Sequence, residues 1–173
     1  MKTLDLSTIP KIARSYSGVN ITLCDLNQSM KRYNIDTSPY FQRGLVWNQN
    51  QKVSFIEAFL REAIIPPIYI NRLDAKKTTA GKVIDGQQRL TTLIDFINDE
   101  IEVFGGYKYS EIDEIKHSTN IRFEFYRFET EKECVQMYLD LIDGTTGHTE
   151  AEMKKARRYL QQLTSDDHLK GCK

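Results

Sequence analysis

The residues best suited to chemistry lie together in the run Asp85-Gly86-Gln87-Gln88-Arg89. An arginine can clamp a phosphate through two hydrogen bonds, and a carboxylate can orient a water molecule or bind a cation. The two glutamines add neutral donors and acceptors, and the glycine permits a close approach between the backbone and a ligand. We therefore predict an anion pocket suited to phosphoryl or phosphodiester chemistry.

This run lies at a predicted junction between a strand and a helix. Residues 82–84 are predicted to form a short strand before it. An apolar stripe at helical spacing follows it at Leu90, Leu93, Ile94 and Ile97. The start of a helix carries unpaired N–H groups and a partial positive charge, which favour an anion. The alternative is a capped helix, with Asp85 as the N-cap and the glutamines and arginine facing solvent.

A second candidate element is the loop over residues 34–48. Gln42 and Arg43 follow two aromatic residues there, and Trp47 is expected to anchor the loop because its ring has a large burial energy. An arginine opposite Arg89 would complete a phosphate cradle. In the alternative interpretation, Arg43 stacks on Tyr40 or Trp47, or pairs with acidic residues elsewhere in the chain.

The remaining pattern mixes helices and strands, so we predict an α+β fold in one domain. Helical spacing of apolar residues predicts helices over 21–33, 50–63 and 130–142, and a further helix after Thr149. Thr149 and Glu152 fit a capping box, and Asn48 or Asn50 can cap the second helix. Strands are predicted over 68–70, 82–84, 101–104 and 121–128.

Charge is balanced over the whole chain but not along it. The 173 residues include 24 basic and 24 acidic side chains, so the formal net charge is zero. Residues 95–150 carry a net charge of −9, whereas 1–35, 36–94 and 151–173 each carry +3. The candidate motifs therefore lie in basic segments, which would attract an anion. The acidic segment 95–150 is also compatible with an ordinary solvated face.

The sequence also limits the compartment. It has no apolar run of 18 residues and no apolar stretch near its start that is typical of a secretory signal. The sequence has three cysteines, Cys24, Cys134 and Cys172. Their odd number and wide spacing favour neither a disulfide framework nor a metal-binding knuckle. We expect a cytoplasmic protein with reduced thiols and no membrane association.

Several motifs follow one another in a recognisable order. They are PYFQR at 39–43, VW at 46–47, the predicted helix over 50–62, IPPIYI at 65–70 and VIDGQQRLTTL at 83–93. Over about residues 20–160 they resemble the DUF262 family, the N-terminal domain of GmrSD-type, modification-dependent restriction systems, which is related to the ParB/sulfiredoxin fold. The resemblance implies a single ParB/sulfiredoxin-like α+β domain with a small mixed sheet and surrounding helices. We expect an N-terminal extension at 1–20, the domain at 21–163 and a polar tail at 164–173.

The resemblance also implies an activity. In this family the DGQQR motif is associated with binding and hydrolysis of a nucleoside triphosphate, here within a restriction, defence or phage-related DNA-handling system. The implied catalytic residues are Asp85, Gln88 and Arg89, with Asp85 also a candidate ligand for Mg²⁺. The implied nucleotide- or phosphate-binding residues are Gln42, Arg43, Gly86, Gln87 and Arg89. Tyr40, Trp47 and His148 are further candidates.

Other functional classes stay open at the level of sequence. Full-length relatives often carry an HNH-type nuclease domain, whereas the three histidines here, His117, His148 and His168, are not clustered. We therefore expect a short stand-alone member, or a regulator that works with a partner nuclease subunit. The alternatives to an enzyme are a non-catalytic DNA- or nucleotide-binding regulator and an inhibitor that docks through its acidic segment. A basic helix with Lys154, Lys155, Arg157 and Arg158 is a candidate DNA contact or an ordinary solvated face.

Overall fold

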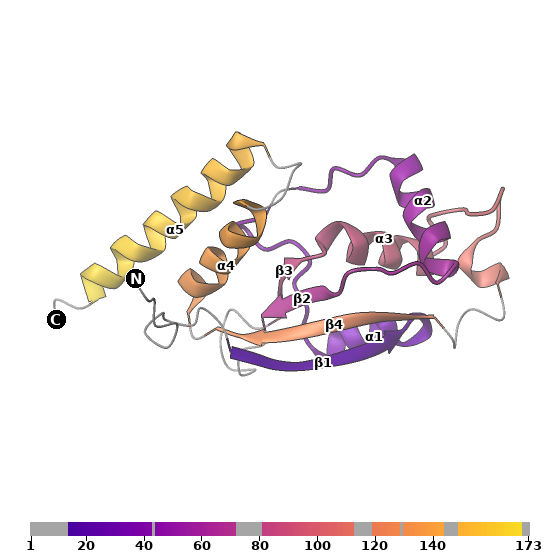
Figure 1. Ribbon diagram of the computed structural model, residues 1–173, viewed down its shortest axis with the longest axis horizontal. Helices are drawn as coiled ribbons and strands as arrows, with labels where there is room; N and C mark the ends of the chain where they lie inside the picture. The colour runs from indigo at the N-terminus through magenta and orange to yellow at the C-terminus, as the bar shows by residue number, and fades with distance from the viewer. Residues whose placement is uncertain are drawn as a thin grey trace, which may run out of the picture.

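One mixed four-stranded sheet organises the chain in the computed structural model, which describes residues 14–42, 44–71, 81–112, 119–128, 130–143 and 149–170 (Figure 1). The strands are β1 (Arg14–Thr22), β2 (Ile68–Asn71), β3 (Lys82–Asp85) and β4 (Asn120–Arg127), in the spatial order β1-β4-β2-β3. β4 pairs antiparallel with β1 and parallel with β2, and β3 pairs antiparallel with β2. The predicted strands at 68–70, 82–84 and 121–128 are confirmed.

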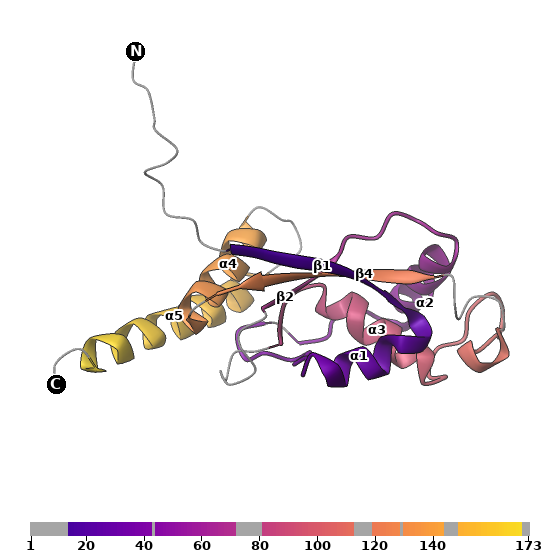
Figure 2. The ribbon, with the colours of Figure 1, turned by 90° about the horizontal axis from the view of Figure 1, so that it is seen from below.

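The helices gather at the two ends of this sheet (Figures 1 and 2). Towards one end lie α1 (Leu26–Arg32), α2 (Gln49–Leu60) and α3 (Gln87–Ile97), with the short 3-10 turns Leu23–Asp25 and Tyr109–Glu111. At the other end lie α4 (Glu131–Asp143) and α5 (Glu150–Lys170), which pack against each other. The predicted α+β class with a small mixed sheet and surrounding helices is confirmed.

Two apolar clusters make up the core, and β3 lies between them. Neighbouring residues of a strand point to opposite faces of the sheet. Val83 accordingly joins the larger cluster beneath α1, α2 and α3, while Ile84 joins the cluster beneath α4 and α5. The next residue, Asp85, is exposed where β3 ends. The predicted anion site, which begins at Asp85, therefore lies where the two apolar clusters meet.

The sequence patterns predicted the starts of two helices. The Asn48 side chain accepts a hydrogen bond from the Gln51 amide, and the Gln51 side chain accepts one from the Asn48 amide, so a complete capping box begins α2. Thr149 and Glu152 make the same reciprocal pair before α5. α5 remains helical to Lys170, through the segment predicted as a polar tail from residue 164.

One predicted helix starts at the wrong residue, and one predicted strand is wrong. The helix expected over 21–33 starts later, because residues 14–22 form β1 and only then does the chain turn into α1. The strand expected over 101–104 is instead a short turn with a single bridge between Val103 and Tyr107. Phe104 and the next two glycines have positive φ angles, which close this turn although the apolar alternation before it is typical of a strand.

Candidate functional site

The turn from β3 to α3 leaves the start of the helix open. Gly86 occupies the N-cap position with φ 93° and ψ 13°, and no side chain caps the helix. Asp85 is the last residue of β3, so its interpretation as the N-cap is wrong. Because the first N–H groups of an α-helix have no partner within the helix, this end is a positive, hydrogen-bond-donating surface.

The turn needs a glycine for two reasons. A φ of 93° lies in the left-handed region, which side chains rarely adopt. A Cβ at Gly86 would also lie 2.6 Å from Cδ1 of Ile68 and 3.0 Å from Nη2 of Arg89. The glycine therefore allows β2, the turn and the arginine to pack closely.

Arg89 lies one helical turn beyond the junction and is held in place by its neighbours. Its Nη2 donates to the Asp85 carboxylate at 2.9 Å and to the Pro67 carbonyl at 3.1 Å. Its side chain is 18% exposed, against 52% for Asp85. Its buried Nε has no hydrogen-bond partner among the described residues. The guanidinium is therefore fixed from two directions and has not used all its donors within the described structure.

These residues line a pocket of about 140 Å³. Its wall comprises the whole Asp85–Arg89 run together with Gln42, Trp47, Ile84 and Tyr138. Small-molecule sites usually measure about 300–1,000 Å³. A pocket of this size suits a phosphate group rather than a complete nucleotide.

Gln42 connects the predicted loop to the end of β3. It is 5% exposed, and its Nε2 donates to the carbonyl oxygens of Val83 and Ile84 at 2.6 and 2.7 Å. The backbone carbonyl oxygen of Gln42 accepts a hydrogen bond from Nζ of Lys155 on α5 at 3.1 Å. Gln42 therefore lies in the pocket wall as expected. Its side-chain nitrogen, Nε2, is used in hydrogen bonds to β3.

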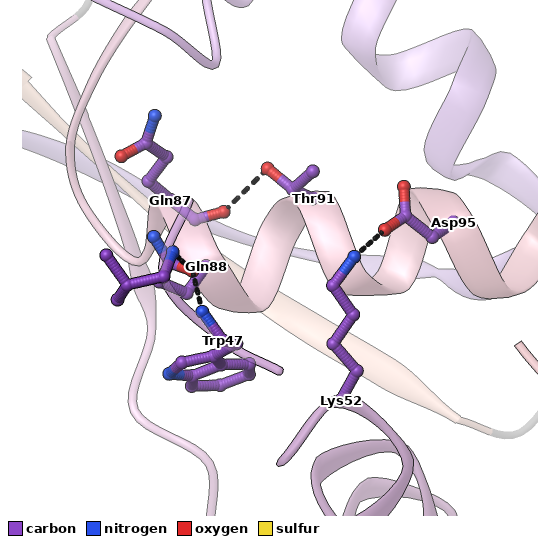
Figure 3. A network of polar contacts seen from close by, with 7 residues as sticks. Trp47, Lys52, Gln87, Gln88, Thr91 and Asp95 are labelled. Atoms are coloured by element: carbon purple, nitrogen blue, oxygen red, sulfur yellow. Dashed lines mark hydrogen bonds and ion pairs between the residues drawn. The ribbon is translucent and has the colours of Figure 1, made fainter. Parts of the chain in front are cut away.

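Gln88 holds the other part of this loop. Its Oε1 accepts hydrogen bonds from the amides of Val46 and Trp47, at 3.0 and 3.2 Å, and its Nε2 donates to the Gly44 carbonyl at 3.1 Å. Figure 3 shows Trp47 beside Gln88 at the start of α3, with Lys52 of α2 reaching Asp95 further along the helix. Gln88 thus positions the loop, and its predicted catalytic role stays a prediction.

The structure brings together most, but not all, of the predicted residues. Trp47 lines the pocket, whereas the Tyr40 ring packs against α5, with its centroid 5.0 Å from that of Tyr159 and 4.8 Å from Nζ of Lys155. Tyr40 is not among the pocket-lining residues. Arg43 and His148 lie outside the described residues, so their predicted roles stay predictions.

Tyr138 is a pocket residue that the sequence did not single out as functional. It lies on α4, is 4% exposed, and packs against Phe41, with 5.4 Å between ring centroids. In the sequence it belongs to an apolar helical stripe with Val135 and Leu139, and such a stripe predicts only a core position. No local signal distinguishes it from its buried neighbours.

A group of titratable side chains connects β3 to α4 and α5. Lys82 of β3 forms an ion pair with Glu131 at the start of α4. Burial, together with the Glu131 charge and a hydrogen bond to it, raises the pKa of Tyr159 to about 12. Burial also raises the pKa of the Cys134 thiol to about 12. These groups lie in or beside the α4–α5 cluster and support the fold around the pocket.

A divalent cation at this site would depend on the ligand for most of its coordination. Among the described residues, no three His, Cys, Asp or Glu side chains are grouped so that they could hold a metal ion. Mg²⁺ is often bound by one or two carboxylates together with substrate phosphates and water. Asp85, which is half exposed at the pocket, can provide one such carboxylate.

No described helix has an apolar stretch long enough to cross a membrane.

Comparisons with known proteins agree with the fold. A structural match is a Pnob8-like ParB-N domain, with a TM-score of 0.50 and 12% sequence identity, covering 91% of this chain and 51% of the other. The chain therefore spans about half the length of that structure, and the match shows a shared fold. A search of curated proteins finds no match. The family profile described as "GmrSD restriction endonuclease, N-terminal domain" matches residues 23–171. Since this match covers most of the sequence, the chain belongs to the GmrSD N-terminal domain family.

Proposed function

We propose that this domain binds a nucleoside triphosphate through its phosphates at the β3–α3 turn and hydrolyses it. The main observation in support of this proposal is the uncapped start of α3. It lines a phosphate-sized pocket together with the fixed guanidinium of Arg89. Helix N–H groups and an arginine are both strong donors to phosphate oxygens. The family membership supports a role in a restriction or defence system. A partner nuclease subunit stays part of the proposal.

The proposed reaction is attack of water on the terminal phosphorus. The bond between that phosphorus and the bridging oxygen breaks, which yields a nucleoside diphosphate and inorganic phosphate. Asp85 would orient the water or hold Mg²⁺ against the phosphates, and Arg89 would stabilise the charge of the transition state. Arg43, adjacent to Gln42 in the sequence, stays a predicted second phosphate ligand.

Phosphate release from ATP, GTP, CTP and UTP, with and without Mg²⁺, tests this proposal. We expect Asp85→Asn to lower the rate at least tenfold and to leave binding nearly intact, because the carboxylate acts on the water or metal. Arg89→Ala should weaken binding about tenfold or more, since it removes a charge-assisted contact.

Two matched variants control for general effects of charge. Asp140→Asn removes an exposed carboxylate on α4 that bonds Gln136, and Arg122→Ala removes a half-exposed arginine paired with Glu124. Both should retain activity, because neither residue lines the pocket. A rate that is unchanged in Asp85→Asn would contradict the hydrolytic mechanism.

A second candidate function is DNA binding through α5. Lys154, Arg157 and Arg158 line one hollow on this helix. Contacts between basic side chains and phosphates weaken steeply with salt. DNA affinity that falls with salt, and is reduced by Lys154→Ala but not by Asp85→Asn, would support a DNA-binding surface separate from the pocket.

A further inference from the structure

Trp47 belongs to two neighbouring hollows. One is the pocket of about 140 Å³ at the β3–α3 turn, and the other is an open hollow of about 390 Å³ at the start of α2. The first is too small for a complete nucleotide, so the sugar and base of a bound nucleotide must extend beyond it. Trp47 lines both hollows, so it lies between the phosphate pocket and the place where we expect the rest of the nucleotide to extend.

The position of Trp47 is fixed in the described structure. Gln88 accepts a hydrogen bond from its backbone amide, and its ring packs against Phe55 with 5.2 Å between centroids. The Lys52–Asp95 ion pair, with 2.6 Å between Nζ and Oδ2, holds α2 against α3 beside it (Figure 3). The indole is half-buried, so part of the ring is anchored while part remains accessible.

Amide side chains line the second hollow beside the aromatic rings. The capping box engages the side-chain oxygens of Asn48 and Gln51 with backbone amides. Within the described part of the chain, the NH₂ groups of these two residues and the exposed amide of Asn50 make no hydrogen bond to protein. Amides of this kind can donate to ring nitrogens and carbonyl oxygens at the edge of a nucleobase.

We propose that this second hollow is a nucleobase subsite, in which the base of a nucleoside triphosphate stacks on Trp47 while Asn48, Asn50 and Gln51 bond its edge. The proposal rests on the proposed function, because the phosphates of the same ligand occupy the β3–α3 pocket. Every base has a π face, so an aromatic ring adds affinity for any nucleotide, and the amides then discriminate between base edges.

Trp47 is the single tryptophan of the chain, so its fluorescence reports directly on the subsite. The test is a titration of the full chain with ATP, GTP, CTP and UTP, and separately with inorganic tripolyphosphate, followed by fluorescence and calorimetry. We expect at least one nucleotide to quench the fluorescence and to bind about tenfold or more tightly than tripolyphosphate, because only a nucleotide has a base to stack.

Variants separate the base contribution from the phosphate contribution. Trp47→Ala should weaken nucleotide binding about tenfold and should weaken tripolyphosphate binding much less, with partial recovery of nucleotide binding in Trp47→Phe. Asn50→Ala changes an exposed residue in the first turn of α2 and should reduce the differences in affinity among the four nucleotides. Tyr107→Ala removes an aromatic residue that is 57% exposed and lines neither hollow, so it should behave as the wild type.

The possible results distinguish the subsite from the proposed function. Equal affinity for tripolyphosphate and every nucleotide would overturn the subsite while leaving phosphate binding in place. Quenching by a single-stranded oligonucleotide but by no nucleotide would also overturn it, in favour of a DNA base on Trp47. Failure of both nucleotide and tripolyphosphate to bind would overturn the proposed function itself.

Discussion

Asp85 and a bound phosphate would compete for the guanidinium of Arg89. The carboxylate of Asp85 accepts a hydrogen bond from Arg89 at 2.9 Å, so the ion pair occupies part of the guanidinium before any ligand arrives. A phosphate is also an anion and would share or replace this contact. Phosphate binding would then free the carboxylate for a metal ion or a water molecule, which links binding to the chemistry that follows.

Gly86 provides a prediction at the residue scale. Gly86→Ala should reduce the free energy of unfolding by roughly 2–4 kcal/mol, because the new Cβ combines a strained φ with crowding against Ile68. It should also weaken phosphate binding, since the Cβ would lie 3.0 Å from Nη2 of Arg89. Urea unfolding and calorimetry with tripolyphosphate measure the two effects.

Gly105→Ala is the matched control for this substitution. Gly105 also has a positive φ, 86°, but a Cβ there would meet nothing within 4 Å. The control should therefore lose only about 1 kcal/mol from backbone strain and should bind phosphate normally. Equal losses of stability in the two variants would show that crowding at the β3–α3 turn has no effect.

The run at the β3–α3 turn, and Gln42 and Trp47 of the preceding loop, could be predicted from sequence, whereas Tyr138 could not. Asp85 to Arg89 lie in one run, so their residue types alone indicate an anion site. Tyr138 reaches the pocket only because α4 packs on β3, and helical periodicity contains no information about which buried ring borders a cavity. The hydrogen bonds between Gln88 and the loop could not be predicted either, because they join residues more than 40 positions apart in the sequence.

At the element scale, the loop before α2 depends on one side chain of α3. Gln88→Ala should speed amide hydrogen exchange at Val46 and Trp47, because both amides lose their acceptor. The loss of stability should be about 1 kcal/mol, since the site is partly exposed. Exchange measured residue by residue tests this prediction.

A glutamine elsewhere on the surface provides the comparison. Gln136→Ala removes a half-buried glutamine on α4 whose Nε2 donates to Asp140, and it should leave exchange at Val46 and Trp47 unchanged. If Gln88→Ala also left exchange there unchanged, other contacts would have to hold the loop.

Elements with strong apolar patterns could be predicted, and those defined by distant pairing could not. β4 alternates Ile121, Phe123 and Phe125 towards the core and was predicted from this period. β1 has few apolar residues, and its pairing with β4 makes it a strand, so local sequence contained little sign of it. Its place at one edge of the sheet explains why a mostly polar segment suffices.

At the scale of the whole molecule, the cluster around α4 and α5 makes stability sensitive to alkaline pH. Cys134 ordinarily ionises near pH 9 and has a pKa of about 12 in the folded protein because it is buried. Its contribution to stability is therefore complete below pH 9 and is lost as pH rises towards 12. We expect the free energy of unfolding to fall by about 1 kcal/mol between pH 9 and pH 10.

A variant without the thiol tests the cause of this fall. Cys134→Ala should show a flatter profile between pH 9 and pH 10, with a decline that begins near pH 10, the ordinary pKa of tyrosine, because the Tyr159 pKa is also raised to about 12. Urea unfolding at intervals from pH 8 to pH 10.5 provides the measurement. Identical profiles in the two proteins would exclude Cys134 as the source.

The position of β4 in the sheet has a consequence for how the chain is made. β1 pairs with β4 alone, yet β1 begins at residue 14 and β4 at residue 120, so the ribosome must synthesise most of the domain before this pair can form. β2 and β3 can meet earlier, but an isolated two-stranded pair is only marginally stable in water. The nascent chain therefore has unpaired strand edges during most of its translation. Such edges can pair with other chains, so we expect the risk of aggregation to be greatest before β4 is made.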